Sequence, residues 1–198
     1  MNILGNKKIS TSTLVLGALL TALVVVLQCM GSFIRFGMFS ISLVLIPIVI
    51  GAALCGPKIS TWLGFVFGVV VLITDAAAFL AIDVFGTVLT VLLKGAACGL
   101  AAGLVYKLLA NKNKYVAVAA AAVVCPVVNT GIFLLGCVAF FFKTIEEWGL
   151  ALGFGSAIEY MFLGLAGGNF LFELGVNIVL SPVIVRLVGI AEAKFSRK

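Results

Sequence analysis

The sequence predicts an all-α integral membrane protein, a six-transmembrane-helix bundle with both termini cytoplasmic. Of the 198 residues, 64% are hydrophobic and 10% are charged, whereas soluble domains contain about 25% charged residues. Several apolar runs reach the length of about 20 residues that crosses a bilayer, and a chain of this size has room for about six of them. The basic residues gather at the ends of these runs. We therefore expect a single membrane domain over residues 1–198.

Short polar segments separate the first three spans. Lys7 and Lys8 precede the apolar run 14–27, and no small-residue cleavage site follows it closely, which favours a retained first span over a signal peptide. Gly56, Pro57 and Lys58 predict a tight turn between the second and third spans. The expected spans are about 11–30, 41–55 and 61–80.

The last three spans are separated by one short turn and one long connector. The polar turn 111–114 follows the fourth span, and the connector 143–161 carries acidic residues, glycines and Trp148. A short basic tail follows the sixth span. The expected spans are about 87–109, 116–142 and 166–190.

The distribution of charge predicts the orientation of the bundle. With the N-terminus inside, ten of the thirteen basic residues are cytoplasmic, which agrees with the positive-inside rule. The acidic residues Asp75, Asp83, Glu146 and Glu147 fall on the other side. The cytoplasmic basic residues are Lys7, Lys8, Lys58, Lys107, Lys112, Lys114, Arg186, Lys194, Arg197 and Lys198.

A few polar residues are predicted deep in the membrane. Asn169, Glu173 and Asn177 recur every four residues, so they share one face of the sixth helix. Lys94 and Asn129, counted at 1.5 Å per residue from the cytoplasmic ends of their helices, lie at about the height of Glu173. Asp75 reaches a comparable or higher level. Such residues are costly in hydrocarbon and usually face something polar.

Two interpretations fit these residues. In the first, they line a small-molecule pocket open to the outside, where Lys94 donates, Glu173 accepts, and Asn129, Asn169 and Asn177 supply directional hydrogen bonds. In the second, Lys94 and Glu173 form a buried ion pair and the amides hold helices together. A pair of this kind can also form the rim of a pocket.

The outer connectors add further candidates. Trp148 could close the pocket together with other aromatic side chains, or these residues could form an interfacial belt. Arg35 could bind an anionic group of a ligand or a lipid phosphate. The other aromatic residues in question are Phe33, Phe36, Phe39 and Tyr160.

Small residues predict close helix packing in two places. The fourth span carries seven glycine and alanine residues between 95 and 103, which suits packing within the bundle. In the first span, Gly17, Ala18, Thr21 and Ala22 form overlapping small-xxx-small pairs near the cytoplasmic end. This second surface could serve packing within the bundle or a partner helix.

The sequence lacks the residues and motifs that several classes of enzyme and metal site require. There is no histidine, no Walker loop and no nucleophile elbow, and the five cysteines show no CxxC spacing. We therefore expect no enzyme, no metal site, no cofactor held by this chain and no nucleic-acid binding. Energy for uphill transport would have to come from outside the chain.

Three stretches together resemble the substrate-binding S component of energy-coupling factor (ECF) vitamin transporters. They are LGALLTALVVVLQ, LVLIPIVIGAALCGPKISTWLGFVFGVV and VLTVLLKGAACGLAAGLVYKLL. The resemblance implies capture of a vitamin or related micronutrient at the outer face of a prokaryotic plasma membrane. It also implies docking on a transmembrane coupling subunit bound to two ATPase subunits, which use the ATP. Ala18 and Ala22 are similar to the family's docking motif.

The identity of the ligand and one other class of function stay open at this point. Lys94 and Asn129 suit a carboxylate that also carries hydroxyl and amide groups, which favours pantothenate, whereas the connector aromatics would equally hold a flat ring system. A stand-alone channel or facilitator is the alternative function. A membrane enzyme acting on lipid through Glu173 and Lys94 is a third and weaker hypothesis.

Overall fold

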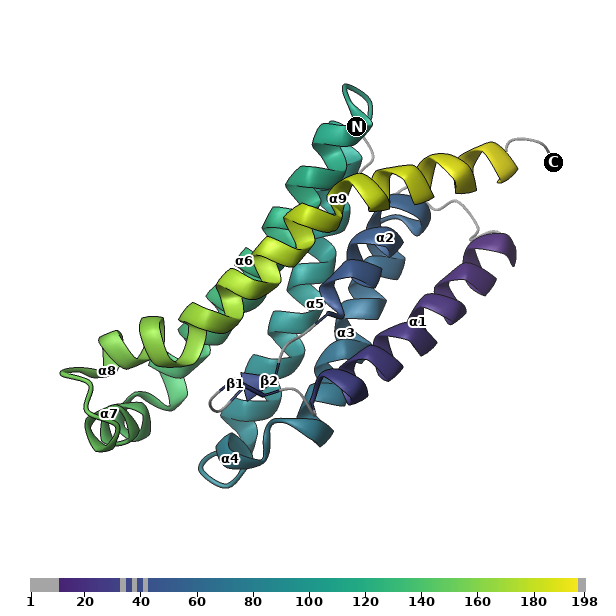
Figure 1. Ribbon diagram of the computed structural model, residues 1–198. Helices are drawn as coiled ribbons and strands as arrows, with labels where there is room; N and C mark the ends of the chain where they lie inside the picture. The colour runs from purple at the N-terminus through teal and green to yellow at the C-terminus, as the bar shows by residue number, and fades with distance from the viewer. Residues whose placement is uncertain (1–10, 33–34, 37–38, 41–42, 196–198) are drawn as a thin grey trace.

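The protein is a bundle of long apolar helices (Figure 1). The computed structural model describes residues 11–32, 35–36, 39–40 and 43–195, with the side chains of residues 11–32 and 43–190. The elements in chain order are α1 (Thr11–Gly31), β1 (Arg35–Phe36), β2 (Phe39–Ser40), α2 (Leu45–Cys55), α3 (Pro57–Thr74), α4 (Ala77–Leu80), α5 (Val84–Leu109), α6 (Lys114–Phe140), α7 (Phe142–Ala151), α8 (Ala157–Glu159), the π-helix η1 (Tyr160–Gly167) and α9 (Gly168–Phe195). The two strands pair antiparallel, with Arg35 opposite Ser40.

Five helical segments in the described part of the chain are long and apolar enough to cross a membrane. They are α1, α3, α5, α6 and the continuous stretch Ala157–Ile190. The protein is therefore an all-helical membrane protein, as predicted. The segment expected as the second span forms only the 11-residue helix α2. At 1.5 Å per residue, α2 is about 17 Å long, which is shorter than the hydrocarbon core of about 30 Å.

Helix boundaries at one end of the bundle differ from the predicted spans. The third helix ends at Thr74 rather than near residue 80, because the chain turns at Asp75 and continues as the short helix α4. The Asp83 side chain then accepts a hydrogen bond from the Phe85 backbone N–H and starts α5 at Val84, before the expected residue 87. The last long helical stretch begins at Ala157, where Ser156 provides the N-cap, and it contains the π-helix η1 ahead of α9.

Glycine residues hold α3 and α5 in direct backbone contact. A side chain added at Gly64 would strike the Gly95 carbonyl, and one added at Gly99 would strike the Ser60 carbonyl. At Gly68 an added Cβ would lie 2.8 Å from the Val91 carbonyl oxygen. The small residues predicted in the fourth span therefore pack within the bundle.

The two ends of the bundle carry opposite kinds of charge. One end, the basic end, holds the start of α3, the end of α5 and the start of α6, with Lys58, Lys107, Lys112 and Lys114 (Figure 1). The other end, the acidic end, holds α4, α7 and α8. Its acidic residues are Asp75, Asp83, Glu146, Glu147 and Glu159. This separation is consistent with the predicted orientation, in which the basic end is cytoplasmic.

Candidate functional site

A small cavity lies between two clusters of buried apolar residues. The larger cluster fills the basic end and middle of the bundle, and the smaller one joins Phe79, Phe141 and Tyr160 at the acidic end. The cavity has a volume of about 40 Å³. Its lining residues come from the end of α3, from α4, from α5 and from α6: Val71, Asp75, Ala76, Phe79, Thr87, Thr90, Val91, Lys94, Phe133 and Phe141.

Lys94 brings a cation into the wall of this cavity. Its ammonium lies 5.7 Å from the centre of the Phe67 ring and 5.3 Å from the centre of the Phe133 ring. Both distances are within the range of a cation–π interaction. Lys94 also interacts electrostatically with Glu173 and Asp75. An ammonium in the wall of a cavity suits an anionic ligand group, because it carries a positive charge and N–H donors.

Asp75 is held in place from α1. Gln28 is 1% exposed, and its side-chain amide donates a 2.8 Å hydrogen bond to Asp75 Oδ2. Thr74 Oγ1 donates a second hydrogen bond of 2.7 Å to the same oxygen. Sequence reasoning named Asp75 but missed Gln28. The signal that could have found it is its position as the one strongly polar residue within the apolar run of the first helix.

The predicted stripe on α9 is buried against α6. Glu173 is 3% exposed and Asn177 2% exposed, and Asn169 Nδ2 donates to Glu173 Oε1 over 3.4 Å. On α6, Asn129 is 6% exposed. Asn129 lies one helical turn beyond the buried Cys125, on the same face of α6.

Four polar atoms in this region are buried with no hydrogen-bond partner. They are Thr90 Oγ1, Asn129 Oδ1, Asn169 Oδ1 and Asn177 Oδ1. An unsatisfied buried polar group costs about 1–3 kcal/mol. Three of the four were predicted binding residues. Thr90 was missed, because a threonine in an apolar helix most often bonds to its own backbone.

Trp148 and Arg35, the two residues of the outer connectors that were predicted to contact the ligand, differ in what the structure describes of them. Trp148 on α7 packs edge to face on Phe79, with ring centres 5.6 Å apart, and Phe79 lines the cavity. Trp148 therefore contacts a residue that lines the cavity but does not line the cavity itself. Arg35 lies in β1, and its side chain is outside the described residues, as are the side chains of Phe36 and Phe39 and the whole of Phe33.

The two alanines predicted to dock a partner lie on the outer face of α1. Ala18 and Ala22 are exposed, together with Leu14, Leu19 and Leu23. Gly17 faces inward instead and packs near Ile59. The small residues of α1 therefore divide between the bundle and the free face.

The residues that line the cavity carry groups suited to binding a small polar molecule. Among them, no group of three or more histidine, cysteine, aspartate or glutamate side chains could hold a metal ion. The cavity offers one ammonium, one carboxylate and two hydroxyls in apolar and aromatic surroundings. This combination suits recognition of a small polar molecule.

The comparison with protein families agrees with this geometry. The family described as "ECF transporter, substrate-specific component" matches residues 12–185. The chain belongs to this family. The resemblance seen in the sequence is thereby confirmed, and the protein is a membrane-embedded substrate-specific component of an ECF transporter. The family is one of transporter subunits rather than of enzymes. Searches of curated proteins and of solved structures found no match.

Proposed function

We propose that this substrate-specific component captures a vitamin or related micronutrient that carries a carboxylate and hydrogen-bonding groups, with pantothenate as the favoured candidate. The observation that supports this proposal is the set of four buried oxygens without partners. Thr90 lines the cavity together with Lys94, whereas the three asparagines lie outside its lining. Polar atoms buried in a membrane bundle are almost always satisfied. A ligand that satisfies Thr90, Asn129, Asn169 and Asn177 would remove this cost.

Each side chain has a chemical role in this proposal. Lys94 attracts the carboxylate of the substrate, because its ammonium is the cation at the cavity wall. The amide oxygens of Asn129 and Asn177 accept hydrogen bonds from hydroxyl or amide groups of the substrate. Asp75, held by Gln28, accepts from a hydroxyl at the acidic end of the cavity.

Binding requires the cavity to widen. Its volume of about 40 Å³ is far below the roughly 300–1,000 Å³ of typical ligand pockets. The aromatic side chains Phe79 and Phe141 of the second apolar cluster, and Phe133 packed against it, close the cavity on that side. Displacement of Phe79 and Trp148 toward the acidic end would enlarge the cavity and open it to the outside.

Transport in this proposal needs partner subunits. The sequence contains no nucleotide-binding loop, so we propose that two ATPase subunits and a transmembrane coupling subunit supply the energy. The exposed face of α1 around Ala18 and Ala22 is the proposed contact with the coupling subunit. The assembly would lie in the plasma membrane of a prokaryote.

Native mass spectrometry of the purified chain tests the proposed function. We expect a small carboxylate-bearing metabolite to co-purify, and calorimetry with that metabolite or with pantothenate to show tight binding by the isolated chain. Asn129→Leu should weaken this binding about fivefold while the protein stays folded, since one charge-neutral hydrogen bond is worth about 1 kcal/mol. Absence of binding across a vitamin panel would refute the proposal. Substrate flux through liposomes that contain this chain alone would favour a facilitator instead.

A further inference from the structure

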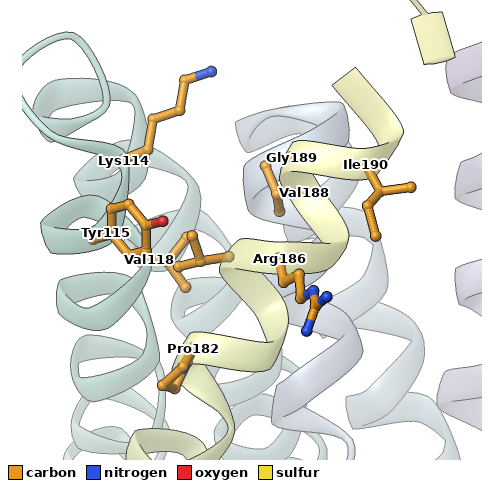
Figure 2. A pocket seen from close by; sticks show the side chains of 9 residues that line it. Lys114, Tyr115, Val118, Pro182, Arg186, Val188, Gly189 and Ile190 are labelled. Atoms are coloured by element: carbon orange, nitrogen blue, oxygen red, sulfur yellow. The ribbon is translucent and has the colours of Figure 1, made fainter. Parts of the chain in front are cut away.

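A second hollow, the α6–α9 groove, lies at the basic end of the bundle, far from the cavity described above (Figure 2). Its volume is about 640 Å³. The start of α6 forms one wall with Lys114, Tyr115 and Val118, and α9 forms the other from Pro182 to Ile190. None of these residues belongs to the proposed substrate site.

The groove combines two cations with an apolar floor. Lys114 belongs to the α6 wall and Arg186 to the α9 wall. In Figure 2 the side chains of Val118 and Pro182 lie between the helices, and the Arg186 guanidinium extends to the side of α9 away from Lys114. Both cations are exposed, so their long side chains can turn toward a shared ligand. In addition, the positive end of the α6 dipole lies at this wall. The combined charge favours an anion at the mouth of the groove.

The length and position of the groove distinguish a lipid from a soluble anion. Pro182 to Ile190 spans about 12 Å along α9, at 1.5 Å per residue. This distance exceeds what a phosphate group alone would occupy, and the remaining lining is apolar. The groove opens beside membrane-spanning helices, at the end predicted to face the cytoplasmic leaflet, where anionic lipids produce a negative surface potential.

We propose that the α6–α9 groove binds one anionic phospholipid. The headgroup phosphate lies between Lys114 and Arg186 once the Arg186 side chain turns into the groove, and the upper part of an acyl chain lies against the exposed residues Pro182 and Gly189. Tyr115, an exposed aromatic residue at this end, is placed to donate a hydrogen bond to the headgroup. The inference is independent of the substrate that the other cavity takes.

Competition between two lipids tests this site on the full chain. The purified protein receives equal amounts of dioleoyl phosphatidylglycerol and dioleoyl phosphatidylcholine, and native mass spectrometry records which lipid stays bound. We expect the wild type to retain phosphatidylglycerol in preference. Arg186→Gln and Lys114→Gln should each lower this preference about fivefold, the factor equivalent to about 1 kcal/mol per basic residue. Arg186→Lys should preserve it.

Two controls separate the groove from general surface charge. Lys112 is exposed at the same end but does not line the groove, so Lys112→Gln should leave the preference unchanged. A Cβ added at Gly189 or at Gly175 meets no atom within 4 Å, so both positions accept leucine. Gly189→Leu fills the groove and should reduce lipid retention, whereas Gly175→Leu, outside it, should not.

Three outcomes would overturn the proposal. The first is equal retention of both lipids by the wild type. The second is wild-type preference in Arg186→Gln, Lys114→Gln and Gly189→Leu alike. The third is displacement of the lipid by millimolar glycerol phosphate, which would show a site for a soluble anion. Far-UV circular dichroism verifies that each variant is folded.

Discussion

The two ends of the α3–α5 pair differ in what surrounds the contact between the helices. Toward the basic end, Gly64, Gly95 and Gly99 bring the two backbones into contact. Toward the acidic end, the close approach continues to Gly68 and Val91, and the neighbouring Thr90 packs against Gly136 of α6 and lines the cavity together with Lys94. Helix α5 thus combines glycine contacts with α3 and polar side chains that line a cavity.

This difference teaches how a small bundle can combine rigidity with binding. Close backbone approach gives extensive van der Waals contact, which stabilises helix pairs in membranes. The packed part leaves no room for substrate between α3 and α5 at the basic end, and Thr90, whose hydroxyl has no partner, lies beyond it in the cavity wall. The arrangement favours capture from one side over a continuous passage.

The largest expected effect comes from breaking the packed part. Gly99→Leu places a side chain against the Ser60 carbonyl, so α3 and α5 must move apart. We expect a loss of more than about 3 kcal/mol of stability, or no folded protein at all. Thermal unfolding in detergent measures the change. Gly175→Leu, where an added Cβ meets no neighbour within 4 Å, is the matched control and should unfold like the wild type.

Replacement of Lys94, the cation in the cavity wall, tests the proposed substrate site. Lys94→Met should weaken substrate binding about 100-fold, since a hydrogen bond to a charged group contributes about 1.5–3 kcal/mol. Stability should fall as well, because the change leaves the buried Glu173 carboxylate without its opposite charge. Calorimetry and thermal unfolding, with Lys112→Met as control, report the two effects. A destabilised protein with unchanged affinity would assign Lys94 to a purely structural ion pair.

A smaller effect is expected from loosening Asp75. Gln28→Leu removes the hydrogen-bond donor from α1 but leaves the hydrogen bond from Thr74. Affinity should fall about fivefold, in line with about 1 kcal/mol for one hydrogen bond. A double-mutant cycle with Asp75→Asn should show coupling between the two positions. Additive effects would contradict the positioning role, and Cys29→Ser, on the exposed neighbouring residue, should have no effect.

The smallest effect on the isolated chain is expected at the free face of α1. Ala18→Leu changes an exposed position, so folding and substrate affinity should match the wild type. Co-purification with the coupling subunit should decrease, because a larger side chain prevents close helix approach. Ala119→Leu, at an exposed alanine on α6, is the control. An intact complex with Ala18→Leu would remove the docking role.

Hydropathy and charge predicted the membrane class, the long helices and the separation of the basic and acidic ends. Depth along the helices also selected Lys94 and Asp75, which both line the cavity. For the second span, hydropathy predicted residues 41–55, and the structure describes the 11-residue helix Leu45–Cys55 within that run. Hydropathy missed the π-helix η1 before α9.

By itself, the amino-acid sequence determined which segments prefer hydrocarbon and which residues are costly there, because both depend on local composition. Only the tertiary structure decided which costly residues share a space. It pairs Gln28 with Asp75 across 47 positions of sequence, and it leaves Thr90 Oγ1 without a partner. Such contacts depend on how each helix is rotated about its axis. That rotation is set by packing against neighbouring helices, which no single segment encodes.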